Sequence, residues 1–372
     1  MAPNLHQFAK KNGVKYFFVS FVDLFGVLRS KLVPATAIDE IQSEGAGFAG
    51  FATWLDMSPA DSDMFGMPDG DSVIQLPWNK EIAWVASDLY MDGKPVETSP
   101  RIALKRQIEK AAQNDHEDAN GQIEMNWDFS DCLVTADRHA FFKFMVKSIA
   151  EKHSLRATFM PKPFTNLTGN GCHCHISIWD KSGKKNMFLD KKDELGLSKT
   201  GYNFLGGIME SADKMAAVFN PTVNSYKRIN GSVTTSGATW SPSSITWAGN
   251  NRTHMVRVPG AGRFELRLMD GATNPYLLQA GILLLGLDGL NNKRDPGKRL
   301  DINMYTEGHK AGKVKKLPLN LLDAIRDFDK SKIIRAGFGN DLVNSYVKLK
   351  NQDWGTFNKH LSSWERETTL DC

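Results

Sequence analysis

Short runs of alternating apolar and polar residues dominate the first quarter of the chain. Residues 16–33 (YFFVSFVDLFGVLRSKLV) form two such runs on either side of Gly26, and this pattern predicts two β-strands joined by a turn. The runs SVIQLPW (72–78) and IAWVASDLYM (82–91) continue the strand pattern. We therefore expect a small β-rich domain over residues 1–94.

Helical periodicity replaces this pattern near residue 95. Ser99 followed by Pro100 is typical of a helix start, and residues 135–153 (TADRHAFFKFMVKSIAEKH) predict a further helix. Residues 229–251 are rich in Gly, Ser, Thr and Asn, which predicts a long loop of the kind that forms lids. Helices that alternate with short strands indicate an α+β fold for residues 95–372, with amphipathic helices at the C-terminal end.

Composition narrows the class of protein. The 372 residues are 41% hydrophobic and 24% charged, and the net charge of +4 is spread along the chain, which favours a small-molecule partner over nucleic acid or a membrane. Four cysteines in a chain of this length do not make a disulfide framework. The N-terminus lacks a signal-peptide pattern and the apolar run AGILLLGLDGL is too short to cross a bilayer, so we expect a cytoplasmic protein.

Two histidines and two cysteines alternate strictly in GNGCHCHISIWD (169–180). In a β-strand, His173 and His175 would share one face while Cys172 and Cys174 shared the other. A histidine in a strand is more often a hydrogen-bonded core residue than a ligand. The alternation therefore does not by itself show which pair is chemical.

Carboxylates and arginines elsewhere in the chain support a chemical role for the histidine face. Glu117 and Glu124 flank a Gly-containing turn, and Glu265 shares a strand face with Arg267. An inward glutamate needs a metal or a positive partner, and a simple pair with a nearby arginine is the alternative interpretation. Five arginines that fall within forty residues suit carboxylates and phosphates; they are Arg228, Arg252, Arg257, Arg263 and Arg267. This is a residue set for phosphoryl transfer without a Walker loop.

Seven motifs along the chain resemble those of the glutamine synthetase family, in the family's order. The N-terminal segments FVDLFGVLRSKLVP (21–34) and SDMFGMPDGDS (62–72) are similar to its small β-grasp domain. The later motifs are HEDANGQIE (116–124), ATFMPKP with GNGCHCHIS (157–177), NPTVNSYKR (220–228), NNRTHMVRVP (250–259) and GRFELRLMDGATNPY (262–276). TTSGATWSP (234–242) and RLDINMYTEGHK (299–310) resemble the γ-glutamylmethylamide synthetase and type III GlnT-like branch.

The resemblance implies a fold, a reaction and a set of site residues. The fold would be a β-grasp domain followed by a catalytic domain with a curved antiparallel sheet and flanking helices. The enzyme would use ATP to phosphorylate the γ-carboxylate of glutamate and would then form an amide with ammonia or a small alkylamine. The implied metal ligands, for Mg²⁺ or Mn²⁺, are Glu117, Glu124, His173 and Glu265. The implied glutamate site is Gly169, Arg228, Arg252 and Arg267, and the implied ATP site is His175, Ser177, Arg257 and Arg263.

The resemblance also implies a shared active site. Asp23 would reach into a neighbouring subunit and help to deprotonate the amine, so we expect a ring-like homo-oligomer. Arg252 and Asp23 are then the residues nearest the chemistry, and a lid over residues 229–240 would exclude water. The histidine face is chemical under this interpretation, and the two cysteines pack inward.

Two departures from the family pattern change the expectation. Ammonia-using members carry a glutamate on the lid, six residues after the arginine that matches Arg228, and here that position is Thr234. A neutral lid favours a small alkylamine. The family also supplies metal ligands from an E-x-E strand that this chain lacks, because a helix leads directly into HEDANGQIE. We expect that residues are missing between Ile108 and His116; a non-catalytic protein with an assembly or glutamate-sensing role is the alternative.

Overall fold

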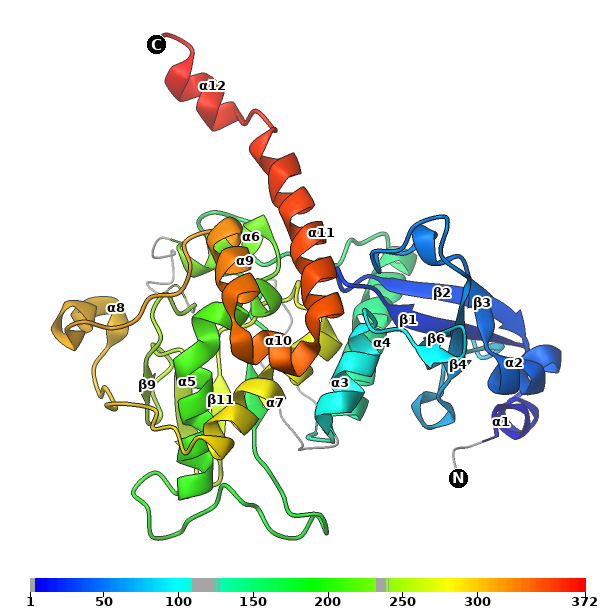
Figure 1. Ribbon diagram of the computed structural model, residues 1–372, viewed down its shortest axis with the longest axis horizontal. Helices are drawn as coiled ribbons and strands as arrows, with labels where there is room; N and C mark the ends of the chain where they lie inside the picture. The colour runs from blue at the N-terminus through cyan, green and yellow to red at the C-terminus, as the bar shows by residue number, and fades with distance from the viewer. Residues whose placement is uncertain (1–3, 109–124, 126–127, 232–238, 240) are drawn as a thin grey trace.

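The computed structural model describes residues 4–108, 125, 128–231, 239 and 241–372. These residues form two lobes, with the N-terminal lobe on the right in Figure 1 and a larger helical lobe on the left. The expected break between Ile108 and His116 lies outside the described residues. Across the part of the chain that is described, no helix is both long enough and apolar enough to span a membrane.

The N-terminal lobe is built on a seven-stranded sheet. Its main path runs β2-β1-β6-β4-β3, and β5 and β7 pair with β6. Two helices, α1 (Leu5–Asn12) and α2 (Ile38–Glu44), pack beside it. The strands are β1 (Tyr16–Val22), β2 (Leu28–Pro34), β3 (Ala46–Phe48), β4 (Met64–Pro68), β5 (Ile74–Gln75), β6 (Ile82–Met91) and β7 (Lys94–Pro95).

The predicted hairpin around Gly26 is confirmed. Strands β1 and β2 pair antiparallel from Tyr16↔Pro34 to Val22↔Leu28. Gly26 has a φ of 77°, which a residue without a Cβ adopts readily. The run 72–78 keeps only two residues in a strand, because the chain turns before it and Pro77 follows it with no backbone donor.

The larger lobe holds a four-stranded sheet in the order β8-β11-β10-β9. Strands β8 (Cys174–Ile176), β11 (Arg263–Leu266) and β10 (Val256–Gly260) are antiparallel, whereas β9 (Trp247–Ala248) adds a short parallel pair. The expectation that 229–251 is loop throughout is therefore wrong at β9, where Trp247 is buried and its backbone pairs with Val256.

Helices cover this sheet. The apolar helix α7 (Pro275–Asn291) packs most heavily on α5 (Lys199–Phe219) and α3 (Pro100–Ile108). The remaining helices are α4 (Cys132–Lys152), α6 (Val223–Ile229), α8 (Met304–Glu307), α9 (Leu321–Lys330), α10 (Lys332–Phe338), α11 (Asn340–Asn358) and α12 (Ser363–Thr369).

A buried arginine ties the lobes together. Arg101 on α3 is 1% exposed and donates hydrogen bonds to Asp137 of α4, Asp88 of β6 and Asp69 after β4. Tyr276 at the start of α7 also donates to Asp137, at 2.8 Å. Four helices and strands thus meet at one charge cluster, which sets the orientation of α3 and α4 against the N-terminal sheet.

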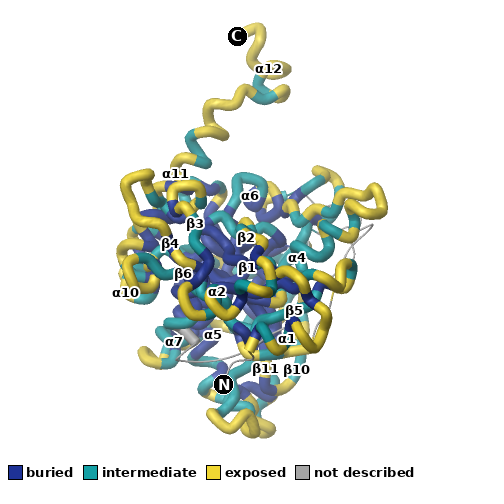
Figure 2. Tube along the Cα trace, turned by 90° about the vertical axis from the view of Figure 1, so that its right-hand side faces the viewer, coloured by how far each residue is buried: buried dark blue, intermediate teal, exposed yellow. Residues whose placement is uncertain are grey.

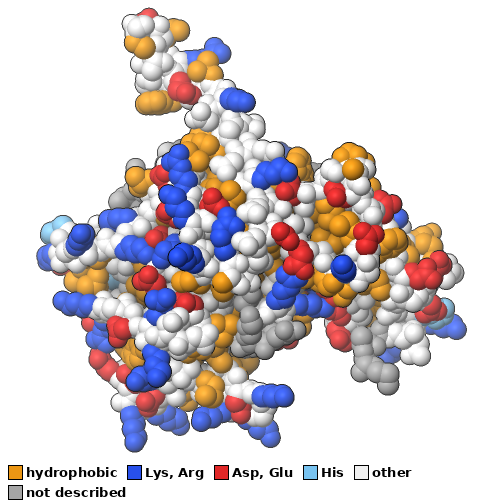
Figure 3. All heavy atoms as spheres, viewed as in Figure 1, with side chains coloured by type: hydrophobic (Ala, Val, Ile, Leu, Met, Phe, Trp, Pro, Cys, Tyr) orange, Lys and Arg blue, Asp and Glu red, His pale blue; other side chains and the backbone are white. Residues whose placement is uncertain are grey.

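The C-terminal helices leave the body of the molecule. Helix α11 runs outward from its contact with the N-terminal lobe, and α12 continues it as a projecting arm (Figure 1). Figure 2 shows that this arm is mostly exposed, with a few residues of intermediate burial, and Figure 3 shows hydrophobic side chains on it. Large apolar residues that remain exposed there are Phe357, Leu361, Trp364 and Leu370.

Candidate active site

Strand register places the predicted site residues on one face of the small sheet. Glu265 lies opposite His175 on β8 and opposite Arg257 on β10, so these three side chains point the same way. Their neighbours Cys174 and Leu266 pair with each other and belong to the hydrophobic core. The register therefore has Cys174 facing the packing side, and His175 on the other face with Glu265, as predicted.

Glu265 is the centre of the cluster. Its side chain is fully buried, and its two oxygens accept hydrogen bonds from Arg267 at 2.5 Å and from Arg257 at 3.0 Å. The pair with Arg267, weighed above as the simple alternative, is therefore present. Both arginines are themselves buried. Removing one partner from such a pair leaves an uncompensated charge in a poorly solvated place, so the three residues form one unit.

His173 lies directly before β8 and faces the same carboxylate. Its Nδ1 is 3.5 Å from Oε1 of Glu265, which brings two of the predicted metal ligands together. Both ring nitrogens are buried and lack a hydrogen-bond partner among the described residues. Burial, followed by the positive charges of Arg267 and Arg228, holds the pKa of His173 well below its ordinary value, so the ring is neutral and its nitrogen lone pair is available.

Arg228, at the end of α6, completes the positive side of the site. Its guanidinium donates to the carbonyl of Leu268 at 2.9 Å and to that of Arg267 at 3.4 Å, and burial lowers its pKa. The chain of residues 169–171 passes close beside it. A Cβ on Gly171 would lie 2.7 Å from Nε2 of His173 and 3.2 Å from Nη2 of Arg228, and a Cβ on Gly169 would lie 2.2 Å from the backbone oxygen of Pro161, so the chain requires glycine at 169. Gly169 is buried against the same arginine.

The remaining predicted residues lie at the edge of the cluster. Arg263 contacts Nδ1 of His175 at 2.7 Å, and Ser177 accepts a hydrogen bond from the Trp179 indole at 3.1 Å. Arg252 is exposed on the turn before β10. Thr234 and the residues around it lie outside the described residues.

Asp23 lies on the hairpin between β1 and β2, and its carboxylate is buried in its own chain. It accepts hydrogen bonds from the backbone of Phe25 and Val27, each at 3.0 Å, and pairs with Arg29 at 2.8 Å. Burial raises the pKa of this carboxyl despite these partners. The conformation described therefore has Asp23 turned toward its own hairpin rather than toward the surface.

The donor set fits a divalent cation in part. A neutral imidazole with two unpartnered nitrogens beside a carboxylate suits a metal such as Mn²⁺. Among the described residues, however, no three His, Cys, Asp or Glu side chains converge, and Glu117 and Glu124 lie outside them. Glu265 is already balanced by two arginines, so a cation here depends on those two further carboxylates.

Two residues that contact or act on the arginines of the cluster were not predicted as site residues. Asn250 accepts from Nε of Arg257 at 2.8 Å, and the buried carboxylate of Asp270 contributes negative charge near Arg228. Burial raises the pKa of Asp270. Both lie within motifs already noted, NNRTHMVRVP and GRFELRLMDGATNPY, where their polar character beside apolar strand positions was the available signal.

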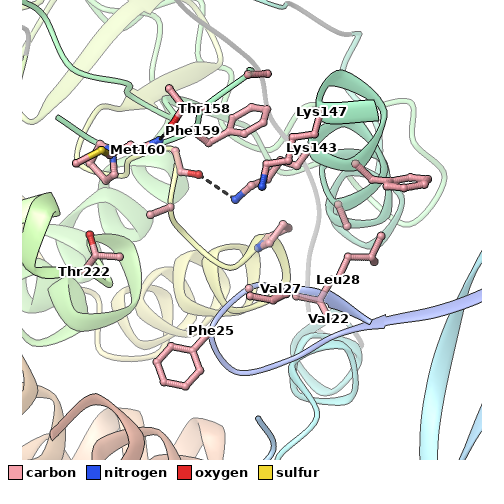
Figure 4. A pocket seen from close by; sticks show the side chains of 18 of the residues that line it. Val22, Phe25, Val27, Leu28, Lys143, Lys147, Thr158, Phe159, Met160 and Thr222 are labelled. Carbon is pink, nitrogen blue, oxygen red and sulfur yellow. Dashed lines mark hydrogen bonds between the residues drawn. The ribbon is translucent and has the colours of Figure 1, made fainter. Parts of the chain in front are cut away.

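A large cavity lies between the β1–β2 hairpin and α4. It has a volume of about 1260 Å³ and is bounded by the β1–β2 hairpin, by α4 and by residues 155–161 (Figure 4). Lys143 projects from α4 and donates to the carbonyl of Gly271 at 2.9 Å, and burial lowers its pKa to about 8. None of the predicted site residues that are described lines this cavity.

Comparison with known proteins agrees with this geometry. Residues 97–369 match the model of the glutamine synthetase catalytic domain. A glutamine synthetase from Rhizobium meliloti is 52% identical, with the whole of both chains covered, and a glutamate–methylamine ligase from Methyloversatilis universalis is 36% identical, also with both chains covered. Both alignments cover more positions than the 372 residues of this chain; the first has 434, an excess of 62.

Solved structures show the same fold. A structure titled GmaS/ADP complex superposes with a TM-score of 0.93 at 49% identity, covering 99% of this chain and all of the other. An apo structure of GmaS without ligand gives the same TM-score at 46% identity. The expected β-grasp lobe followed by a glutamine-synthetase-type catalytic lobe is confirmed. On this evidence of sequence, fold and buried arginine–carboxylate site, the chain belongs to the glutamine synthetase family.

Proposed function

We propose that this protein is an ATP-dependent ligase that forms an amide between the γ-carboxyl group of glutamate and ammonia or a small alkylamine. One observation carries the proposal: two buried arginines, Arg257 and Arg267, pair with Glu265, and a third, Arg228, lies near the neutral His173 beside it. Such a cluster holds carboxylate and phosphoryl oxygens through fixed donors in a place that excludes water. Glutamine synthetase and glutamate–methylamine ligase relatives support the same reaction.

We propose the following division of roles. Arg228 and the backbone at Gly169 hold glutamate, and Arg252 with Arg267 stabilises charge on its γ-carboxylate during phosphoryl transfer. His175, Ser177, Arg257 and Arg263 face ATP. His173 and Glu265, with Glu117 and Glu124, would hold Mg²⁺ or Mn²⁺, which when bound neutralises phosphate charge. The role of Asp23 at a neighbouring subunit requires its hairpin to turn the carboxylate outward, because it is buried in the single chain.

The preferred amine is proposed from Thr234. A neutral side chain at this position holds ammonium weakly and leaves room for an alkyl group. Methylamine should therefore support kcat/KM at least as high as that of ammonium at equal glutamate and ATP, and Thr234→Glu should shift the preference toward ammonium. A large preference of the unaltered protein for ammonium would contradict this proposal. Measurement of amine-dependent phosphate release with glutamate tests the ligase reaction itself.

We further propose that residues are missing from the chain between Ile108 and His116. The excess of 62 aligned positions over the chain length supports an internal gap. A non-catalytic protein with a sensing or assembly role is the competing function, and it is favoured if purified protein releases no phosphate in the assay above. Cys132, Cys172 and Cys174 are buried or half-buried and Cys372 is exposed, and none of the four forms a disulfide, which suits the reducing cytoplasm that we propose as its location.

A homo-oligomer with shared active sites is proposed from the C-terminal arm. Trp364 and Leu370 are 67% and 80% exposed, and the arm carries them away from the body of the molecule (Figures 2 and 3). Large apolar side chains that project in this way are covered when they dock on a second copy of the chain.

A further inference from the structure

The hairpin that carries Asp23 is anchored through one aromatic ring. The ring of Phe25, at the hairpin tip, lies 5.6 Å from the ring of Trp54 on one side. On another side the Nζ atom of Lys350, from α11, lies 4.3 Å from the centre of the Phe25 ring. A cation at this distance from an aromatic face is attracted to it, and more strongly where water is excluded.

Lys350 is buried to an unusual degree for a lysine. It is 2% exposed, and its partners besides Phe25 are the ring of Tyr346 at 5.8 Å and the carboxylate of Asp353 at 3.6 Å, both from α11 itself. The charges of Asp23 and Asp270 also act on it. Burial of an ammonium group with so few close partners costs free energy. The contact between this charge and the Phe25 ring therefore needs an explanation.

The opposite side of the hairpin is poorly packed. Phe25, Gly26 and Val27 line the cavity of about 1260 Å³ (Figure 4), so that side offers little support among the described residues. A second anchor is Asn274, the N-cap of α7, whose side chain donates to the carbonyl of Asp23 at 2.8 Å. Asn274 holds the base of the turn, and Lys350 holds its tip.

We propose that Lys350 is a positioning residue for the Asp23 hairpin: its cation–π contact with Phe25 holds the backbone of the tip in place, so that the Asp23 carboxylate, when its side chain turns outward, meets the amine at a fixed position. This inference rests on the proposed ligase function and on the proposed role of Asp23. It adds a link between α11, which continues into the projecting arm, and the step in which the amine attacks.

The test uses Lys350→Met, which keeps the length and removes the charge, and Lys350→Arg, which retains a cation for the ring. At pH 7 with saturating ATP and glutamate, Lys350→Met should lower kcat/KM for the amine about tenfold, while KM for glutamate and ATP stays unchanged. Lys350→Arg should recover most of the loss. Hydrogen exchange at the Phe25 and Val27 amides, which Asp23 protects, should quicken in Lys350→Met.

A double-mutant cycle keeps the test decisive if one variant is distorted. Phe25→Leu removes the ring but keeps an apolar side chain, so Lys350→Met and Phe25→Leu together should lose no more than either alone. Lys348→Met is the matched control, because Lys348 lies on the same helix and pairs across the lobes with Asp56 but is largely exposed. It should leave the amine parameters and the hairpin exchange unchanged.

The outcomes separate this inference from the proposed function. Full amine activity in Lys350→Met, additive losses in the cycle, or an equal rise in KM for all three substrates would overturn the positioning role. If the unaltered protein releases no phosphate with any amine, the ligase function fails instead. In that case the rate of amide hydrogen exchange at Phe25 and Val27 is the remaining test. An unchanged rate in Lys350→Met would exclude the Lys350–Phe25 contact as an anchor of the hairpin.

Discussion

Glu265 shows how a single buried carboxylate organises this site. It pairs with both Arg257 and Arg267 and lies 3.5 Å from His173, so its charge supports both the fold and the proposed chemistry. The surrounding arginines outnumber it, and this imbalance leaves the cluster suited to bind anions. The excess positive charge of these few residues therefore explains why we propose substrates that carry carboxylate and phosphate groups.

Replacement of this carboxylate should be severe. Glu265→Gln keeps the shape but leaves two buried arginines without their counter-charge, and we expect a loss of about 3–5 kcal/mol in the free energy of unfolding together with loss of phosphate release. Urea denaturation and the amine-dependent assay measure the two effects. Glu194→Gln, which breaks an exposed pair with Arg299, is the matched control and should change neither. Equal stability of the two variants would contradict the account.

Lys350 makes stability depend on pH in a defined window. Burial lowers its pKa from 10.5 to about 8 in the folded protein, so between these values the unfolded chain binds more protons than the folded one. Stability relative to Lys350→Met should therefore rise from pH 8 toward pH 10.5 and be constant below pH 8. Unfolding free energies of both proteins at pH 7, 8.5 and 10 test this, since other titrating groups cancel in the difference. A flat difference would show that Lys350 is not perturbed.

At the scale of elements, Arg101 decides how α3 and α4 sit against the N-terminal sheet. It serves Asp69, Asp88 and Asp137 at once, and these carboxylates come from three different parts of the chain. The arrangement is an ion network with an almost fully buried cation. Without Arg101 these carboxylates would lack their counter-charge in a poorly solvated place. The arginine therefore stabilises the fold by avoiding that cost.

Arg101→Met should destabilise the protein by about 3–5 kcal/mol, because it leaves these carboxylates unpaired. Chemical denaturation measures the loss. Lys105→Met is the control on the same helix; Lys105 pairs with Asp88 and lies 3.8 Å from Asp69 but is far more exposed, so its removal should matter much less. If both variants lost the same stability, burial of the arginine would not be the cause.

At the scale of the whole molecule, the C-terminal arm projects from the end of α11 away from both lobes (Figure 1). Deletion of residues 360–372 removes Leu361, Trp364 and Leu370, all of them exposed. We expect the truncated protein not to form the proposed homo-oligomer while the body of the subunit stays folded, because the core of the larger lobe includes residues of α11 but none beyond it. Light scattering and circular dichroism separate these effects. An unchanged oligomer would exclude the arm as an interface.

The proposed internal gap is tested by insertion. The residues that the Rhizobium meliloti relative carries opposite the gap, placed between Ile108 and His116, should raise both the unfolding temperature and metal-dependent phosphate release. A glycine–serine insert of equal length is the control and should raise neither. If the chain without an insert is already fully active, the gap has no functional consequence and the proposal is wrong.

The sequence by itself determined most of the local structure. Alternation around Gly26 predicted the β1–β2 hairpin, and Ser99 with Pro100 predicted the start of α3. The period of a strand puts His173 with His175 on one face, and Glu265 with Arg267 on one face, without coordinates; the pairing of β8 with β11 then brings the two faces together. Motif order also identified the family. These features depend on residues that are close in the chain, and for that reason a local pattern is enough to specify them.

Only the tertiary structure decided how distant residues share charge and space. Glu265 is paired to two arginines at once, Asp23 is turned into its own hairpin, and Lys350 lies over Phe25 across more than 300 residues of chain. Each outcome depends on which elements pack together and how much water they exclude, since burial sets the strength of a charge interaction. A linear pattern carries the residue types for these contacts, but the packing of the lobes selects the partners.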